Sequence, residues 1–147
     1  MNDDLKELLT LLNSHRVEYL VIEAHAVAFY GRPRMTEDVD LLVGKRVENS
    51  LKMEAALKAF GAPIGDSGAA RFSEQERPMI RIGVPPNQDD ILNFGGSKEF
   101  AHVWERRVSG WLNGVPVCFP SKVDLIEMKQ VSGRAQDLAD IERLNQK

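Results

Sequence analysis

Two aspartates, Asp38 and Asp40, stand one residue apart at the head of the apolar run "VDLLV" (39–43). Aspartate is among the poorest strand formers, so its presence there needs an explanation. Residues two apart on a strand point to the same face, which puts these two carboxylates side by side, roughly 7 Å apart at Cα. Such carboxylates repel each other unless a cation lies between them. Hard oxygen ligands suit Mg²⁺, which typically uses one or two carboxylates and fills its other positions with water and substrate phosphates.

A third carboxylate is expected from a neighbouring strand. Asp90 opens the segment "DIL", which repeats the acid-then-apolar order that begins at Asp40, and we predict that it completes the site; Asp89 is assigned to the preceding turn. The alternative is that Asp38 ends a turn and Asp40 faces solvent, because a D-x-D pair alone is a weak signal. The apolar neighbours of Asp40 favour the metal site, since a half-buried carboxylate needs a partner.

The apolar periodicity of the chain predicts the elements that position these carboxylates. Helices are expected at 3–14, 24–30, 47–60, 97–104, 121–131 and 134–144, and strands at 17–22, 39–43, 79–84, 90–94, 108–112 and 115–119. Residues 61–76, rich in Gly, Ala and Ser, are expected to be a loop or to hold a short strand near 70–72. This order predicts an α+β fold, a small mixed sheet flanked by helices, in a single domain over 1–147.

Local signals predict how several of these elements begin, end and face. Gly31 is expected to end its helix in the left-handed conformation. Asn113-Gly114 is the strongest short hairpin signal, and Ser121 with Asp124 forms a capping box. In the last helix, Leu138, Ile141 and Leu144 are predicted to face inward. Asp137 and Asp140, with Arg134, are predicted to form a surface ion-pair network.

The bulk composition is that of a globular protein: 147 residues, 43% hydrophobic and 28% charged, with a net charge of −3. The negative charge argues against bulk electrostatic capture of nucleic acid. No apolar run approaches the roughly 18 residues of a membrane span, and the acidic start does not resemble a signal peptide. The single cysteine, Cys118, is interpreted as inert packing. We therefore expect a cytoplasmic protein that does not bind membranes.

Four segments in order carry a family resemblance: "YLVIEAHAVAFYGRPRMTEDVDLLV", "IRIGVPPNQDDILNF", "VWERRV" and "LIEMKQVSGRAQDLADIERL". The first is quite specific, because a helix that ends in G-x-P-R-x-T-x-D-x-D-L is an unusual combination. The chain resembles the nucleotidyltransferase superfamily, and more narrowly its small stand-alone members related to the AbiEii-type toxins and the minimal nucleotidyltransferases.

The resemblance implies a fold and an activity. It implies a small mixed sheet flanked by helices, and transfer of a nucleoside monophosphate from an NTP such as ATP to a hydroxyl or phosphate acceptor with Mg²⁺. Asp38 and Asp40 would hold Mg²⁺ against the triphosphate. Asp90 would bind a second ion or draw the proton from the acceptor hydroxyl.

The resemblance also implies which residues bind phosphate. The glycine-rich start of the helix before D-x-D falls on Glu23-Ala24, and the basic group near the triphosphate falls on Lys129 and Arg134. Arg34 and Thr36, next to the aspartate pair, would contact phosphate or fix the loop.

Glu23 departs from the family pattern, in which a glycine leaves room for phosphate. Either its side chain points away or the protein binds nucleotide poorly. Three functions stay open: a Mg²⁺-dependent nucleotidyltransferase, such as the toxin of a toxin–antitoxin pair that modifies tRNA or a protein; a binding or regulatory protein that has lost catalysis; and a Mg²⁺ phosphohydrolase that uses water as the acceptor.

Overall fold

A computed structural model describes residues 3–31, 38–44, 46–62, 79–83, 88–93 and 99–145 of the chain. The helices are α1 (Asp3–Ser14), α2 (Glu23–Tyr30), α3 (Val47–Phe60), α5 (Phe100–Glu105), α6 (Lys122–Ser132) and α7 (Ala135–Asn145). The strands are β1 (Tyr19–Ile22), β2 (Asp40–Val43), β3 (Met79–Ile82), β4 (Asp89–Leu92), β5 (Val108–Leu112) and β6 (Val115–Phe119). Most of the loop expected at 61–76 lies outside the described residues.

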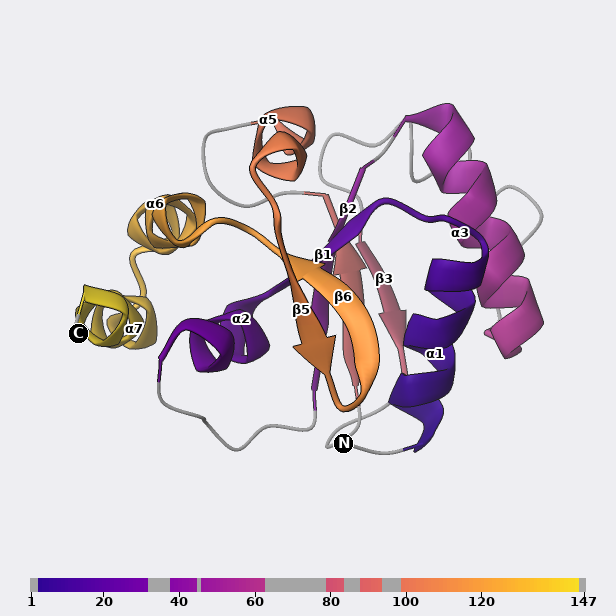
Figure 1. The fold of residues 1–147 in the computed structure, drawn as a ribbon, viewed down its shortest axis with the longest axis horizontal. Coiled ribbons are helices and arrows are strands. Elements are labelled where there is room, and N and C mark those ends of the chain that lie inside the picture. The colour runs from indigo at the N-terminus through magenta and orange to yellow at the C-terminus, as the bar shows by residue number, and fades with distance from the viewer. Residues whose placement is uncertain are drawn as a thin grey trace.

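Four strands form a mixed sheet in the order β1-β2-β4-β3. The central strands β2 and β4 are parallel, and the outer strands β1 and β3 each run antiparallel to their neighbour. Figure 1 shows α1 and α3 on one side of this arrangement and α2, α6 and α7 on the other, with the β5–β6 hairpin beside β1. The expected fold, a small mixed sheet flanked by helices, is confirmed.

The sheet buries apolar side chains on both faces. Leu5, Leu8, Leu9 and Leu12 form the fully buried stripe of α1 and share one core cluster with Val21, Leu41 and Ile91 of the sheet. The alternate strand residues, Leu20, Ile22 and Leu42, pack with Val103 of α5 and Met128 of α6 in a second cluster. Strands covered on both faces read as continuous apolar runs, and β1, "YLVI", is such a run.

The local turn and cap signals give mixed results. The hairpin is confirmed: φ is +50° at Asn113 and +81° at Gly114. The N-cap of α6 is also confirmed, because Ser121 Oγ accepts a hydrogen bond from the backbone N–H of Asp124 at 3.1 Å. The expectation for Gly31 is wrong. Its φ and ψ are −148° and −138°, so α2 ends without the left-handed residue that such a cap requires.

The predicted facing of α7 is also wrong in part. Leu144 is buried and Ile141 is half-buried, but the side chain of Leu138 is 58% exposed. Asp137 and Asp140, expected on the surface, are each only 1% exposed. The inward face of α7 therefore carries two carboxylates, which is stable only because cations from α6 and the α6–α7 turn meet them there.

Candidate active site

The pairing of β2 with β4 brings the predicted carboxylates together. Asp40 is the first residue of β2, and its partner in the parallel register is Asp90 of β4. Asp38 lies two residues before the start of β2, and its Oδ1 accepts a hydrogen bond from the backbone N–H of Gln88 at 2.9 Å. Three acidic residues from segments some 50 positions apart in the sequence thus meet at one end of the two central strands.

Asp89 lies in β4 and not in the preceding turn, contrary to the sequence prediction. Its side chain is buried, and its Oδ1 accepts from the backbone N–H of Val39 at 3.2 Å. Burial, with the nearby charges of Asp38 and Asp90, raises the pKa of Asp89 to about 6. Because successive strand residues point to opposite faces, Asp89 and Asp90 have separate surroundings.

Arg81 on β3 is a member of the site that sequence reasoning missed. It stands opposite Asp90 in the antiparallel β3–β4 register, and its Nε and Nη2 donate to the two oxygens of Asp90 at 3.0 and 3.4 Å. The signal was present in the alternation of "MIRI", but only the register shows which acid the arginine meets. Arg81 neutralises part of the charge of Asp90 and holds its carboxylate in place.

Asp40 is half-buried among other carboxylates. Burial is the largest cause of its raised pKa, followed by the charges of Glu23, Asp90, Asp38 and Asp89, and together they bring this pKa to about 7. Desolvation and like charges both disfavour ionisation. A cation placed beside Asp40 would relieve both effects.

Glu23 is joined to this site through the β1–β2 pairing. It follows Ile22, which pairs with Asp40, and it is the first residue of α2. Its φ is +59°, in the left-handed region where glycine is the least strained residue. Ala24 follows it in the first turn of α2 and is buried.

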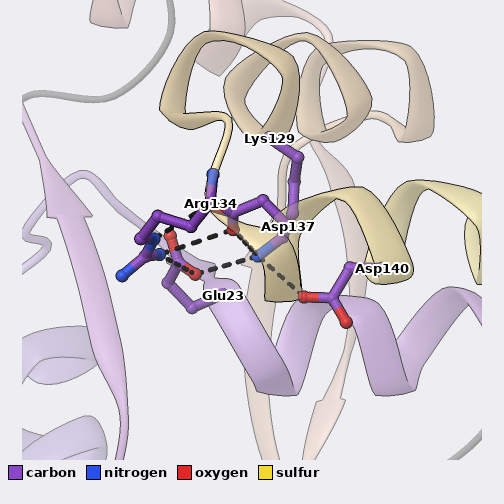
Figure 2. A network of polar contacts seen from close by, with 5 residues as sticks. All are labelled: Glu23, Lys129, Arg134, Asp137 and Asp140. Atoms are coloured by element: carbon purple, nitrogen blue, oxygen red, sulfur yellow. Dashed lines mark hydrogen bonds and ion pairs between the residues drawn. The ribbon is translucent and has the colours of Figure 1, made fainter.

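The side chain of Glu23 points towards α6 and α7, where it enters an ion-pair network, and Figure 2 shows the five residues concerned. We call this group the Lys129 network; it consists of Glu23, Lys129, Arg134, Asp137 and Asp140. Nζ of Lys129 lies 2.9, 3.2 and 3.1 Å from carboxylate oxygens of Glu23, Asp137 and Asp140, respectively. The ammonium group is therefore enclosed by carboxylates, and the lysine side chain is 2% exposed.

Arg134 closes the network from the solvent side. Its Nε donates to Asp137 at 2.8 Å and its Nη2 to Glu23 at 3.5 Å, while its side chain is 66% exposed. Asp137 also accepts from the backbone N–H of Arg134 and so caps the start of α7. Burial acts to raise the pKa of Asp137, but hydrogen bonds from Arg134, Ser132 and Lys129 outweigh it and hold that pKa well below its usual range.

The expected site residues thus fall into two adjoining groups. Asp38, Asp40 and Asp90 form the acidic end of the sheet, while Glu23, Lys129 and Arg134 form the network beside it. Arg34 and Thr36, which the resemblance placed near phosphate, lie outside the described residues.

The fit of Mg²⁺ rests on the chemistry of the donors. Among the residues that the structure describes, no group of three or more His, Cys, Asp or Glu side chains is already arranged around a common point as a metal site. The carboxylates of Asp38, Asp40 and Asp90 are nevertheless the hard oxygen donors that Mg²⁺ prefers, and burial among like charges raises the pKa of Asp40.

Several solved structures of other proteins share the fold of this chain. Neither a protein-family model nor a curated protein sequence matches the chain. Solved structures do: the lincosamide antibiotic adenylyltransferase LnuA, with lincomycin bound, is 14% identical with a TM-score of 0.63 over 98% of this chain and 96% of that one. The ANT(2″)-Ia complex with adenylyl-2″-tobramycin is also 14% identical, with a TM-score of 0.63 over 95% of this chain and 84% of that one.

A third structure extends the likeness beyond these antibiotic-modifying proteins. A nucleotidyltransferase-like protein from Paracoccidioides brasiliensis is 20% identical, with a TM-score of 0.53 over 95% of this chain and 75% of that one. The chain has the nucleotidyltransferase fold.

Within the described residues, no helix has the length and apolar character needed to span a membrane.

Proposed function

We propose that this chain is a Mg²⁺-dependent nucleotidyltransferase that uses its whole length as one domain. The observation that carries the proposal is the side-by-side placement of Asp40 and Asp90, with Asp38 adjacent, at the end of the central strands. The nucleotidyltransferase fold and the start of α2 beside these carboxylates support it.

The proposed roles follow from the needs of nucleotidyl transfer, which depends on positioning and charge neutralisation. Asp38 and Asp40 would hold the ion, and Mg²⁺, when bound, would neutralise charge on the phosphates. Asp90, steadied by Arg81, would bind a second ion or accept the proton of the acceptor hydroxyl. Arg134, exposed at the edge of the Lys129 network, would contact the leaving pyrophosphate.

The acceptor is a separate part of the proposal. The resemblance to small toxin-related nucleotidyltransferases supports an RNA or a protein as the acceptor, with an antitoxin as a binding partner in the cytoplasm. Two of the structural neighbours are bound to lincomycin and to adenylyl-2″-tobramycin, so small hydroxyl-bearing molecules belong in the same assay.

The test is transfer of label from α-³²P-labelled NTPs and Mg²⁺ to total RNA, to cell protein and to small hydroxyl-bearing acceptors. Label that stays on one acceptor and is lost with Asp40→Asn or Asp90→Asn supports transfer. Asp89→Asn is the matched control: it removes the neighbouring charge from the other face of β4 and should retain activity. Label released only as free nucleotide contradicts transfer and supports hydrolysis, with water as the acceptor.

A second candidate is a nucleotidyltransferase-fold protein that binds or regulates without catalysis. The observation that favours it is Glu23, whose carboxylate lies at the start of α2 and engages Lys129 and Arg134. Binding of a macromolecular partner by the Asp40→Asn variant, with no label transfer by the wild type, would support this candidate.

A further inference from the structure

The conformation of Glu23 is unusual for its residue type. A non-glycine residue at φ of +59° is strained by close contact between its Cβ and its own backbone. Such strain persists only where surrounding interactions hold it in place. Here the ion pairs from the side chain of Glu23 to Lys129 and Arg134 supply that restraint.

The five described residues of the Lys129 network carry unequal numbers of opposite charges. Three of them are carboxylates and two are cations. If Glu23 leaves, Lys129 keeps two carboxylate partners, because its Nζ lies 3.2 and 3.1 Å from oxygens of Asp137 and Asp140 on α7. Glu23 is therefore the surplus carboxylate of the network.

The surplus carboxylate stands where an incoming anion would meet the protein. It lies at the N-terminal end of α2, whose backbone N–H groups and dipole favour negative charge. Its side chain is 34% exposed, and Arg134, which it contacts, is 66% exposed, so both can rearrange towards solvent.

We propose that Glu23 is an affinity-determining, autoinhibitory residue: its carboxylate occupies the place of a phosphate beside Arg134, and a polyphosphate binds by displacing it. This inference rests on the proposed function, because it takes the ligand to be a nucleoside triphosphate. When Glu23 is displaced, Arg134 contacts the phosphate in its place, while Lys129 stays with Asp137 and Asp140.

The inference predicts that removing the charge of Glu23 strengthens binding. Titration calorimetry with MgATP, and with inorganic triphosphate, should give a Kd at least tenfold lower for Glu23→Gln than for the wild type. Glu23→Gly removes the backbone strain as well and should bind at least as tightly as Glu23→Gln. Glu142→Gln is the matched control, because it removes one negative charge from an exposed position on α7, outside the network, and should leave Kd unchanged.

Arg134 supplies a second, independent readout. In the wild type its guanidinium is engaged by Glu23, so Arg134→Ala alone should change Kd by less than threefold. In the Glu23→Gln background, Arg134→Ala should remove most of the gain in affinity for MgATP. Equal Kd values for the wild type, Glu23→Gln and Glu23→Gly would overturn the inference. A gain in affinity that survives Arg134→Ala would also overturn it, as would the absence of binding by every variant.

Failure of the inference and failure of the proposed function give different results. If Glu23→Gln binds MgATP more tightly but transfers no label, the autoinhibitory contact stands and the proposed activity does not. If the wild type transfers label in an Asp40-dependent way and Glu23→Gln binds no better, the activity stands and the role of Glu23 is refuted.

Discussion

Asp40 and Asp90 are direct partners in the parallel register of β2 and β4, so two carboxylates from the middle of the sheet face the same space. Arg81 pairs with Asp90, whereas burial and the surrounding carboxylates raise the pKa of Asp40 to about 7. The two carboxyl groups therefore differ in their electrostatic surroundings, although the sheet places them side by side.

The raised pKa of Asp40 predicts how stability depends on pH. In the unfolded chain this carboxyl ionises near pH 4, whereas in the folded protein it ionises only near pH 7. Between these values the folded state holds the proton more tightly, so the free energy of unfolding falls as pH rises from 4 to 7. Asp40→Asn removes the effect. It should raise the free energy of unfolding by about 2 kcal/mol at pH 8, about half of what the full shift implies because the site is partly solvated.

Urea denaturation at pH 4 and pH 8 measures this difference. At pH 4 the variant and the wild type should differ by less than about 0.5 kcal/mol. Glu7→Gln, at an exposed position of α1 beyond its first turn, is the control for loss of one negative charge. An equal effect of Asp40→Asn at both pH values would contradict the prediction.

Divalent ions should stabilise the protein through the same carboxylates. At pH 8, Mg²⁺ in large excess over its Kd should raise the wild-type Tm by several degrees, since a ligand that binds only the folded state adds to its stability. Asp40→Asn should abolish the increase. Thermal melts in MgCl₂, compared with NaCl of equal ionic strength, measure it, and an increase of the same size in the variant would show that Mg²⁺ acts elsewhere.

Lys129→Met should destabilise the fold strongly. The substitution keeps the apolar stem but leaves the buried carboxylates of Asp137 and Asp140 without their ammonium partner. Breaking a buried ion pair by removing one partner typically costs about 3–5 kcal/mol. Urea denaturation at pH 7 measures this loss, and Lys52→Met, at an exposed position of α3, should change stability by less than about 0.5 kcal/mol.

Lys129→Met should also lose less stability in acid, where protonation removes the charge of the carboxylates that have lost their ammonium partner. The folded-state pKa of Asp137 is depressed in the wild type, so its contribution to stability is present above pH 4 and declines as pH falls. A cost of Lys129→Met that does not shrink between pH 7 and pH 3 would refute this account of the network.

Gly110 is required by close packing. A Cβ added there would lie 2.7 Å from Cε1 of Phe29 and 3.0 Å from Cε2 of Phe119, two rings that stack on each other at 4.1 Å. Gly110→Ala should therefore cost about 1–3 kcal/mol through overpacking. In a Phe29→Leu background, which trims the nearer ring, the same substitution should cost less.

Gly114→Ala is the comparison for Gly110. At Gly114 a Cβ would meet nothing within 4 Å, but φ is +81°, so its cost of about 1 kcal/mol should come from the backbone alone. The Phe29→Leu background should not change that cost. Urea denaturation of the wild type, the three single variants and the two double variants separates the two causes, and equal relief at both glycines would contradict this assignment.

The elements themselves could be predicted because their signals are local. The leucine stripe of α1, Asn113-Gly114 in the hairpin and Ser121 before α6 each act within a few residues. The sequence likewise predicted a strand over 39–43, and β2 occupies Asp40–Val43. The predictions for Asp89 and Leu138 were wrong because the deciding contacts, made by Val39 and by Lys129, come from elsewhere in the chain.

By itself, the sequence determined the order of helices and strands, the α+β class and the identity of the acidic residues, because propensity and periodicity depend on near neighbours. Only the tertiary structure decided that Asp40 meets Asp90, that Arg81 pairs with Asp90, and that Glu23 reaches Lys129 across 106 positions. The physical reason is that strand register and helix packing bring these charges together. Which cation neutralises which carboxylate is a property of that packing and not of the local sequence.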